Sequence, residues 1–196
     1  MSIFSSSPPF FSISEVKTIS FKEYGLKVTV KKLDSDRDQN FHLVLASGNQ
    51  FVLKIYNSDE DNDIIDLHTN VLCHLEKQQL QLIKTPILIK TLDKKRTGKI
   101  IKDNKIYRFR LVSYIKGTQL KDIKKNKISF YDLGSSIANI LKILSSLEDL
   151  RAKRYFPWDV GNIQFVLENS SKLNNKNKEK LIDYYIRHYQ NRLAPL

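Results

Sequence analysis

Apolar and polar residues alternate in three short segments near the start of the chain, and a period of two is typical of half-buried strands. Residues 24–33, 40–46 and 51–56 each place apolar side chains at every second position. Between the last two segments, Gly48 and Asn49 favour a tight turn because both residues tolerate a positive φ. The pattern therefore predicts three antiparallel strands.

Helical periodicity begins after an acidic, polar stretch. Apolar residues recur at helical spacing over residues 63–79. Two further strands are predicted at residues 86–92 and 105–114, and two further helices at residues 129–150 and 177–192. Five strands with one inserted helix, followed by helices alone, predict an α+β fold.

Three parts are expected along the chain. Residues 1–20 lack a positively charged leader and a clear cleavage site, so we interpret them as a flexible N-terminal arm rather than a signal peptide. Residues 21–116 form the sheet domain. Residues 117–196 form a helical segment, reached through the stretch at residues 114–117.

The composition is that of a globular protein. Of 196 residues, 41% are hydrophobic and 28% are charged, which excludes a disordered chain. A single cysteine, Cys73, excludes a disulfide framework and favours a reducing compartment, so a cytoplasmic location is expected. No apolar run approaches about 20 residues, so no membrane span is predicted.

The net charge of +12 raises the question of nucleic-acid binding. The lysines are scattered, and the densest clusters, at residues 121–127 and 172–180, lack interleaved aromatic residues and any nucleic-acid motif. We interpret the charge as solvated background, which disfavours a nucleic-acid partner.

Candidate chemistry lies in residues 34–41 and in the strand that follows. The first segment is a polar, hydroxyl-bearing loop, and the strand F-V-L-K-I at residues 51–55 carries one lysine, Lys54, inside an apolar run. An ammonium group is costly to bury unless an anion lies close, and a triphosphate is such an anion. The alternatives are an ordinary polar turn and a lysine on the solvent face of an edge strand.

The run S-D-R-D-Q-N-F at residues 35–41, together with F-V-L-K-I, resembles the aminoglycoside phosphotransferase and choline kinase-like superfamily, and within it the hydroxylysine kinase-like branch. The segment R-F-R-L-V-S-Y-I-K-G at residues 108–117 resembles the hinge strand of the same proteins. The similarity covers most of residues 24–162. It implies a protein kinase-like N-lobe, with a five-stranded antiparallel sheet plus one helix, followed by the helical start of a C-lobe.

The resemblance also implies a nucleotide-binding site. Its loop residues would lie over the phosphates, its strand lysine would reach them, and the hinge backbone would hold the base. The implied nucleotide-binding residues are Ser35, Arg37, Asn40, Lys54, Ser113, Tyr114 and Ile115. Asp66 and His68, in the following helix, are the candidates for pairing with Lys54.

The catalytic half of the superfamily pattern is absent from this sequence. None of the four histidines begins a motif resembling H-G-D-x-x-x-x-N, which supplies the base and metal ligands in the superfamily. The run Asp132-Leu133-Gly134 imitates a kinase metal motif, but it starts a predicted helix, where an acidic residue is favourable. We therefore assign no catalytic residue and no metal ligand.

These observations predict the N-terminal, nucleotide-binding part of a small-molecule kinase, inactive as this chain alone. The resemblance implies ATP or GTP with Mg²⁺ as cofactor and phosphorylation of a hydroxyl group, with a small amino alcohol such as hydroxylysine as substrate. A separately encoded C-terminal lobe is the expected partner. The alternative is a non-catalytic pseudoenzyme that binds a partner protein.

Overall fold

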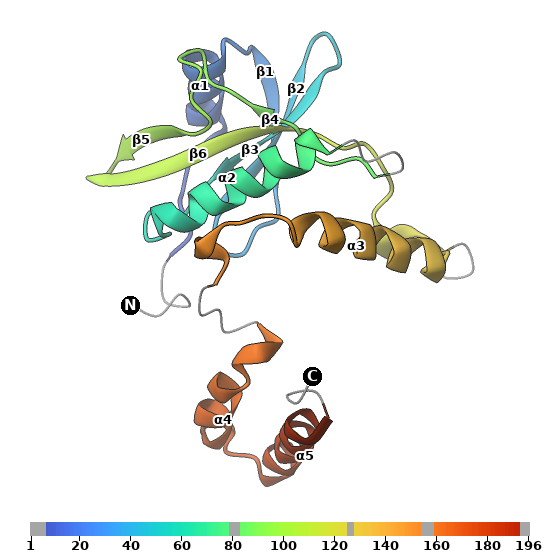
Figure 1. Ribbon diagram of the computed structural model, residues 1–196. Helices are drawn as coiled ribbons and strands as arrows, with labels where there is room; N and C mark the ends of the chain where they lie inside the picture. Colours follow the sequence, from blue (N-terminus) through green and yellow to red (C-terminus); the bar gives the residue numbers. More distant parts are fainter. Residues whose placement is uncertain (1–6, 79–82, 125–127, 154–158, 193–196) are drawn as a thin grey trace. The chain divides into compact units, whose positions relative to one another are not determined.

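The computed structural model describes residues 7–78, 83–124, 128–153 and 159–192 (Figure 1). The chain divides into two compact units, Met1–Asp149 and Leu150–Leu196. Among the described residues, the first unit contains the sheet and three α-helices, and the second unit is helical. The domain boundary expected at residue 117 stays a prediction.

One antiparallel sheet forms the centre of the first unit. Among the described residues it has six strands, in the order β1-β2-β3-β6-β4, with β5 also paired to β6. The strands are β1 (Val28–Leu33), β2 (Gln39–Leu45), β3 (Gln50–Ile55), β4 (Leu88–Ile89), β5 (Gly98–Lys102) and β6 (Lys105–Ser113). The α+β class and the antiparallel sheet agree with the sequence analysis.

Strand β5 lies where the sequence predicts a charged hairpin connection and no strand. Gly98 pairs with Phe109, and Lys102 pairs with Lys105 across a tight turn. Asp103 has a positive φ of 49° in that turn. The expected count of five strands therefore falls one short, because lysine-rich sequence at a sheet edge does not show the alternation of a half-buried strand.

Helix α1 (Ile13–Tyr24) covers the last part of the segment for which a flexible arm is predicted, residues 13–20. The helix begins with a capping box, in which the Ser12 amide donates to Glu15 Oε2 at 2.8 Å and the Glu15 amide donates to Ser12 Oγ at 3.2 Å. Val16 and Ile19 are buried. The structure differs from the prediction because these apolar side chains pack into the core.

The hydrophobic core lies between α1 and one face of the sheet. Alternate residues of the central strands point to this face. The buried strand residues of this cluster are Phe41, Leu43, Leu53, Ile55, Phe109 and Leu111. Helix α2 (Asn62–Lys77) lies on the opposite side of the sheet, in front of it in Figure 1. We call this side the α2 face.

Helix α3 (Phe130–Leu144) completes the helices of the first unit, and the Asp132 amide donates to the Ser129 hydroxyl at its start. Helices α4 (Gln164–Ser170) and α5 (Lys176–Arg192) form the second unit. Short 3-10 turns span Leu120–Asp122, Leu150–Ala152, Val160–Asn162 and Ser171–Leu173. Within the described residues, every helix is too short or too polar to span a bilayer.

Candidate functional site

Lys54 projects from the central strand β3 onto the α2 face, since its neighbours Leu53 and Ile55 are buried on the core face. Its side chain is 25% exposed and forms an ion pair with Asp38, whose side chain is 14% exposed. Asp38 belongs to the loop between β1 and β2. The ammonium group therefore lies against the loop that the sequence predicts as a phosphate cover, and not in bulk water.

Internal hydrogen bonds hold the loop between β1 and β2. Asn40 Nδ2 donates to Ser35 Oγ at 3.1 Å, which ties the loop tip to the start of β2. Asp38 Oδ1 accepts a hydrogen bond from the Asn57 amide at 2.9 Å. Arg37 forms a 3.4 Å ion pair with Glu60. The roles of Ser35, Arg37 and Asn40 toward a nucleotide stay predictions.

Arg110 is a second cation on the α2 face, and the sequence analysis does not assign it. Antiparallel pairing places it directly opposite Lys54. The ring centroid of Tyr56 lies 5.3 Å from Lys54 Nζ and 5.5 Å from Arg110 Cζ. Burial raises the pKa of Tyr56 to about 12, and burial lowers the pKa of Arg110. Only the strand register, which a single sequence does not reveal, brings these side chains together.

The two candidates for pairing with Lys54 have other partners. Asp66 accepts a 2.6 Å hydrogen bond from Arg108 Nη2, and His68 stacks on Tyr56 with ring centroids 6.4 Å apart. In this structure Asp66 pairs with Arg108 of β6 and Lys54 pairs with Asp38, so a pairing of Asp66 with Lys54 stays a prediction. The anion that pairs with Lys54 comes from the loop instead of from α2.

The hinge residues are Ser113, at the end of β6, and the two residues that follow it. The Tyr114 amide donates to Gln50 O at 3.0 Å, which joins the hinge to the start of β3. The Ile87 amide donates to Ser113 Oγ at 2.8 Å. The Tyr114 ring packs on His42, with ring centroids 4.3 Å apart. This places an aromatic side chain at the end of the α2 face, near the predicted base-binding segment.

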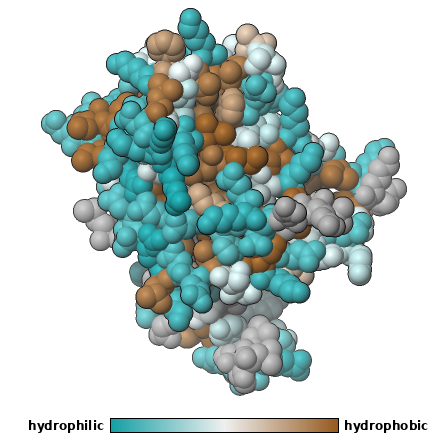
Figure 2. Space-filling view, turned by 45° about the horizontal axis from the view of Figure 1, so that its top comes forward, coloured by the Kyte–Doolittle hydropathy of each residue, from teal (hydrophilic) through white to brown (hydrophobic). Residues whose placement is uncertain are grey.

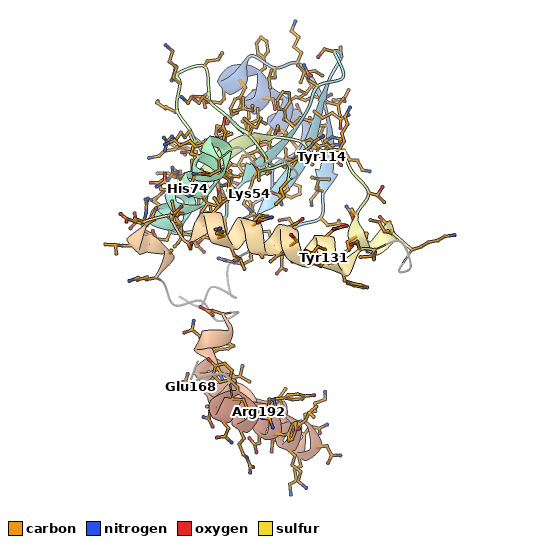
Figure 3. All side chains as sticks on the ribbon, turned by 45° about the vertical axis from the view of Figure 1, so that its right-hand side comes forward. Lys54, His74, Tyr114, Tyr131, Glu168 and Arg192 are labelled. Carbon is orange, nitrogen blue, oxygen red and sulfur yellow. The ribbon has the colours of Figure 1, made fainter. Side chains whose placement is uncertain are left out.

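A cavity of about 590 Å³ lies at this hinge, in the first unit. Ser113, Tyr114 and Ile115 line it together with the β2–β3 turn and the end of α2, whereas Lys54 and Ser35 are not among its lining residues. Figure 3 labels both Lys54 and Tyr114 in this unit. The structure thus places the predicted base-binding and phosphate-binding residues on one lobe, but not in one closed cavity.

Metal-binding chemistry is not evident in the part of the chain that the structure describes. There, no group of three or more His, Cys, Asp or Glu side chains is arranged to hold a metal ion. Asp132 starts helix α3. Phosphoryl transfer needs a carboxylate base and oxygen ligands for magnesium. That this chain supplies neither stays a prediction.

Taken together, an antiparallel sheet with a strand lysine, a helix beside it and a hinge strand leading to helices defines the N-lobe of a kinase-like fold. Two solved kinases share this fold. An amicoumacin kinase, solved in complex with AMP-PNP and Ca²⁺, matches 89% of this chain and 54% of its own at a TM-score of 0.65 and 13% identity. A microcompartment-associated aminopropanol kinase matches 81% of this chain and 49% of its own at a TM-score of 0.61 and 12% identity.

Sequence comparison points to one kind of kinase. Hydroxylysine kinase of Danio rerio is 26% identical over 96% of this chain and 56% of its own length. Hydroxylysine kinase of Xenopus laevis is 24% identical over 94% of this chain and 54% of its own length. Hydroxylysine kinase of Bos taurus is 24% identical over 89% of this chain and 51% of its own length. The resemblance to the aminoglycoside phosphotransferase superfamily, and to its hydroxylysine kinase-like branch, is confirmed. No family model matches the chain, and the chain spans about half the length of these relatives.

Proposed function

We propose that this chain is the nucleotide-binding part of a small-molecule kinase of the hydroxylysine kinase-like kind. One observation carries the proposal: Lys54 lies on a central strand of a kinase-like sheet and contacts Asp38 of the loop that contains Ser35. In this proposal the loop and Lys54 bind the phosphates of ATP or GTP. The hinge backbone at residues 113–115 binds the base.

The residues of the site fit a nucleotide better than they fit its metal. Lys54 and Arg110 offer two cations on one face, which suits a polyanionic phosphate chain. Among the described residues no cluster offers magnesium a set of ligands. We therefore propose that the metal ligands and the base come from another polypeptide and that this chain alone transfers no phosphoryl group.

The expected acceptor is the hydroxyl group of an amino alcohol, because the sequence relatives are hydroxylysine kinases. A separately encoded C-terminal lobe would complete the enzyme. We place this enzyme in the cytoplasm, since the Cys73 thiol is free.

Thermal melting with increasing Mg-ATP or Mg-GTP tests nucleotide binding. The wild-type chain should melt at a higher temperature as nucleotide is added, because a ligand that binds the folded state stabilises it. Lys54→Ala should lose most of this shift, measured against its own nucleotide-free melt. Lys99→Ala is the matched control, since Lys99 is an exposed lysine of strand β5. Equal shifts in wild type and Lys54→Ala would refute the proposal.

A second candidate function is partner binding without catalysis, favoured by the surface of α3. Apolar side chains of this helix are exposed in the first unit, including Phe130 at 72%, Tyr131 at 83% and Leu141 at 61%. On the face drawn in Figure 2, hydrophobic residues (brown) are exposed among hydrophilic ones (teal). Several exposed large apolar side chains on one helix favour a protein partner.

Mixing the chain with the C-terminal half of a hydroxylysine kinase tests this candidate. Leu141→Asp should abolish a complex that size-exclusion chromatography detects with the wild-type chain. Lys54→Ala should leave the complex unchanged. If the mixture phosphorylates hydroxylysine, the complex is an enzyme; a complex without activity favours the non-catalytic partner-binding module. Failure of the wild-type chain to form a complex counts against both the separate lobe and this surface.

A further inference from the structure

Two cationic side chains stand directly opposite each other on the α2 face. Lys54 of β3 and Arg110 of β6 are paired residues of adjacent antiparallel strands, so their side chains leave the sheet on the same side. Like charges in such a position repel each other and destabilise the pair of strands. Other groups must therefore offset this repulsion.

The ring of Tyr56 is one such group. Its centroid lies within 6 Å of both cationic groups, at 5.3 Å from Lys54 Nζ and 5.5 Å from Arg110 Cζ. Tyr56 is completely buried. An aromatic ring attracts a cation but carries no net charge, so it reduces the repulsion without neutralising the site.

The carboxylate of Asp38 is the other group. One of its oxygens pairs with Lys54 and the other accepts the Asn57 amide. Arg110 forms no ion pair with any described residue, and its Nη1 is buried without a hydrogen-bond acceptor among them. One carboxylate thus faces two cations, and one guanidinium nitrogen lacks an acceptor.

We propose that Lys54 and Arg110 form a two-cation site for a phosphoryl group, an inference that rests on the proposed function. In this structure, the carboxylate of Asp38 occupies this site. A phosphoryl group carries more charge and more acceptor oxygens than a carboxylate, so it can contact both cations at once. It takes the place of Asp38 on Lys54 and supplies the acceptor that Arg110 Nη1 lacks. Arg110 is then a phosphate-binding residue.

The exchange couples ligand binding to the loop between β1 and β2. Asp38 is fixed to that loop and to the Asn57 amide, so its carboxylate leaves Lys54 when the loop moves. A ligand therefore binds better to the conformation in which the loop has moved, and it shifts the population toward that conformation. Asp38 competes with the ligand, and its removal strengthens binding.

Isothermal titration calorimetry with inorganic tripolyphosphate tests this inference on the full chain. Asp38→Asn should bind about tenfold more tightly than wild type, because the amide keeps the shape and the acceptor for Asn57 but loses the competing charge. Arg110→Met should bind about tenfold more weakly. Asp36→Asn, an exposed position of the same loop, controls for the charge change, and Lys99→Met controls for the loss of a cation.

The signs of the two effects decide the outcome. Opposite changes for Asp38→Asn and Arg110→Met, with both controls equal to wild type, support the two-cation site. Weaker binding by Asp38→Asn, unchanged binding by Arg110→Met, or no binding by wild type overturns it. If Asp38→Asn does not fold, hydrogen exchange of the wild-type Asn57 amide decides. Faster exchange with tripolyphosphate supports displacement of Asp38, and equal or slower exchange overturns it.

This test separates the inference from the proposed function. Tripolyphosphate binding with the expected signs, without any shift of melting temperature by Mg-nucleotide, would refute the nucleotide function and keep the anion site. A nucleotide shift that depends on Lys54 but not on Arg110 or Asp38 would keep the function and refute the two-cation site.

Discussion

Asp66 of α2 and Arg108 of β6 form an ion pair in which Arg108 Nη2 donates to Asp66 Oδ1 at 2.6 Å. The same Arg108 Nη2 lies 2.6 Å from Thr97 Oγ1, just before β5, and Nη1 lies 3.3 Å from Asn62 Oδ1 at the start of α2. One guanidinium group of β6 therefore contacts both α2 and the residue that precedes β5. The pair fixes α2 on the same face as Lys54.

Replacing Arg108 should destabilise the fold more than replacing Asp66. The Arg108 side chain is 12% exposed and the Asp66 side chain 45% exposed, so solvent screens the carboxylate more strongly. Arg108→Ala leaves the partners of the guanidinium group without a donor and should cost about 1–3 kcal/mol, whereas Asp66→Ala should cost less than about 1 kcal/mol. Urea denaturation measures both. Equal losses would show that the ion pair alone, and not the wider set of hydrogen bonds, stabilises α2.

Gly98→Ala should also destabilise the sheet. Gly98 of β5 pairs with Phe109, whose fully buried ring covers it, and a Cβ at this position would overlap the ring atoms. The ring is confined by the core, so the substitution should cost about 1–3 kcal/mol in chemical denaturation.

The matched control is Gly134→Ala in helix α3, where a Cβ meets no atom within 4 Å. This change should be neutral or stabilise the chain by up to about 1 kcal/mol, because alanine favours a helix more than glycine does. Similar losses at both positions would contradict the argument from the Phe109 ring.

Much of the sheet follows from the sequence, because β1, β2 and β3 alternate apolar and polar residues and the turn between β2 and β3 has Gly48 at a φ of 85°. The strand that carries Lys54 and the two strands that flank the proposed phosphate loop are therefore predictable. The start of helix α1 also has a sequence signal, since the Ser12 to Glu15 spacing is that of a capping box. The mixture of serine and apolar residues in this segment led to the prediction of an arm.

The partners within the site are not predictable from one sequence. Asp38 and Lys54 belong to different segments of the sequence, and only the folded loop brings their side chains together. Arg110 becomes relevant only when β6 pairs with β3 in the observed register. Hydrophobic patterning determines which face a residue occupies, but it does not determine which neighbour lies opposite.

Glu15 should make stability depend on acid pH. Hydrogen bonds from Lys102 and from Ser12 lower the pKa of Glu15 from an ordinary 4.5 to about 2. The folded state therefore favours the ionised carboxylate, and its contribution is present above the ordinary pKa and is lost as the pH falls through that window. The wild type should melt a few degrees above Glu15→Gln at about pH 7. The gap should narrow as the pH falls below about 4.5 and close only below about pH 2.

Lys102→Met tests the cause of that dependence, because Lys102 Nζ lies 2.7 Å from Glu15 Oε1. Introducing Glu15→Gln into the Lys102→Met background should produce a smaller gap at neutral pH. Added salt should also reduce the wild-type gap, since both side chains of the pair are partly exposed. A gap that is the same at neutral and acid pH would refute the assignment.

Asn57 should be one of the residues whose loss most disturbs the proposed phosphate loop. It is 2% exposed, and its Nδ2 donates to Ser7 O at 2.9 Å and to Arg37 O at 3.2 Å, while its Oδ1 accepts the Asp59 amide at 3.0 Å. Asn57→Ala leaves these groups unpaired and should cost about 2–3 kcal/mol of unfolding free energy. Asn57→Asp should cost at least as much, because a carboxylate has no donor for the two carbonyls. Asn49→Ala, in the exposed turn between β2 and β3, should change stability by less than about 0.5 kcal/mol. An Asn57→Asp variant as stable as wild type would show that the amide donors do not hold the loop.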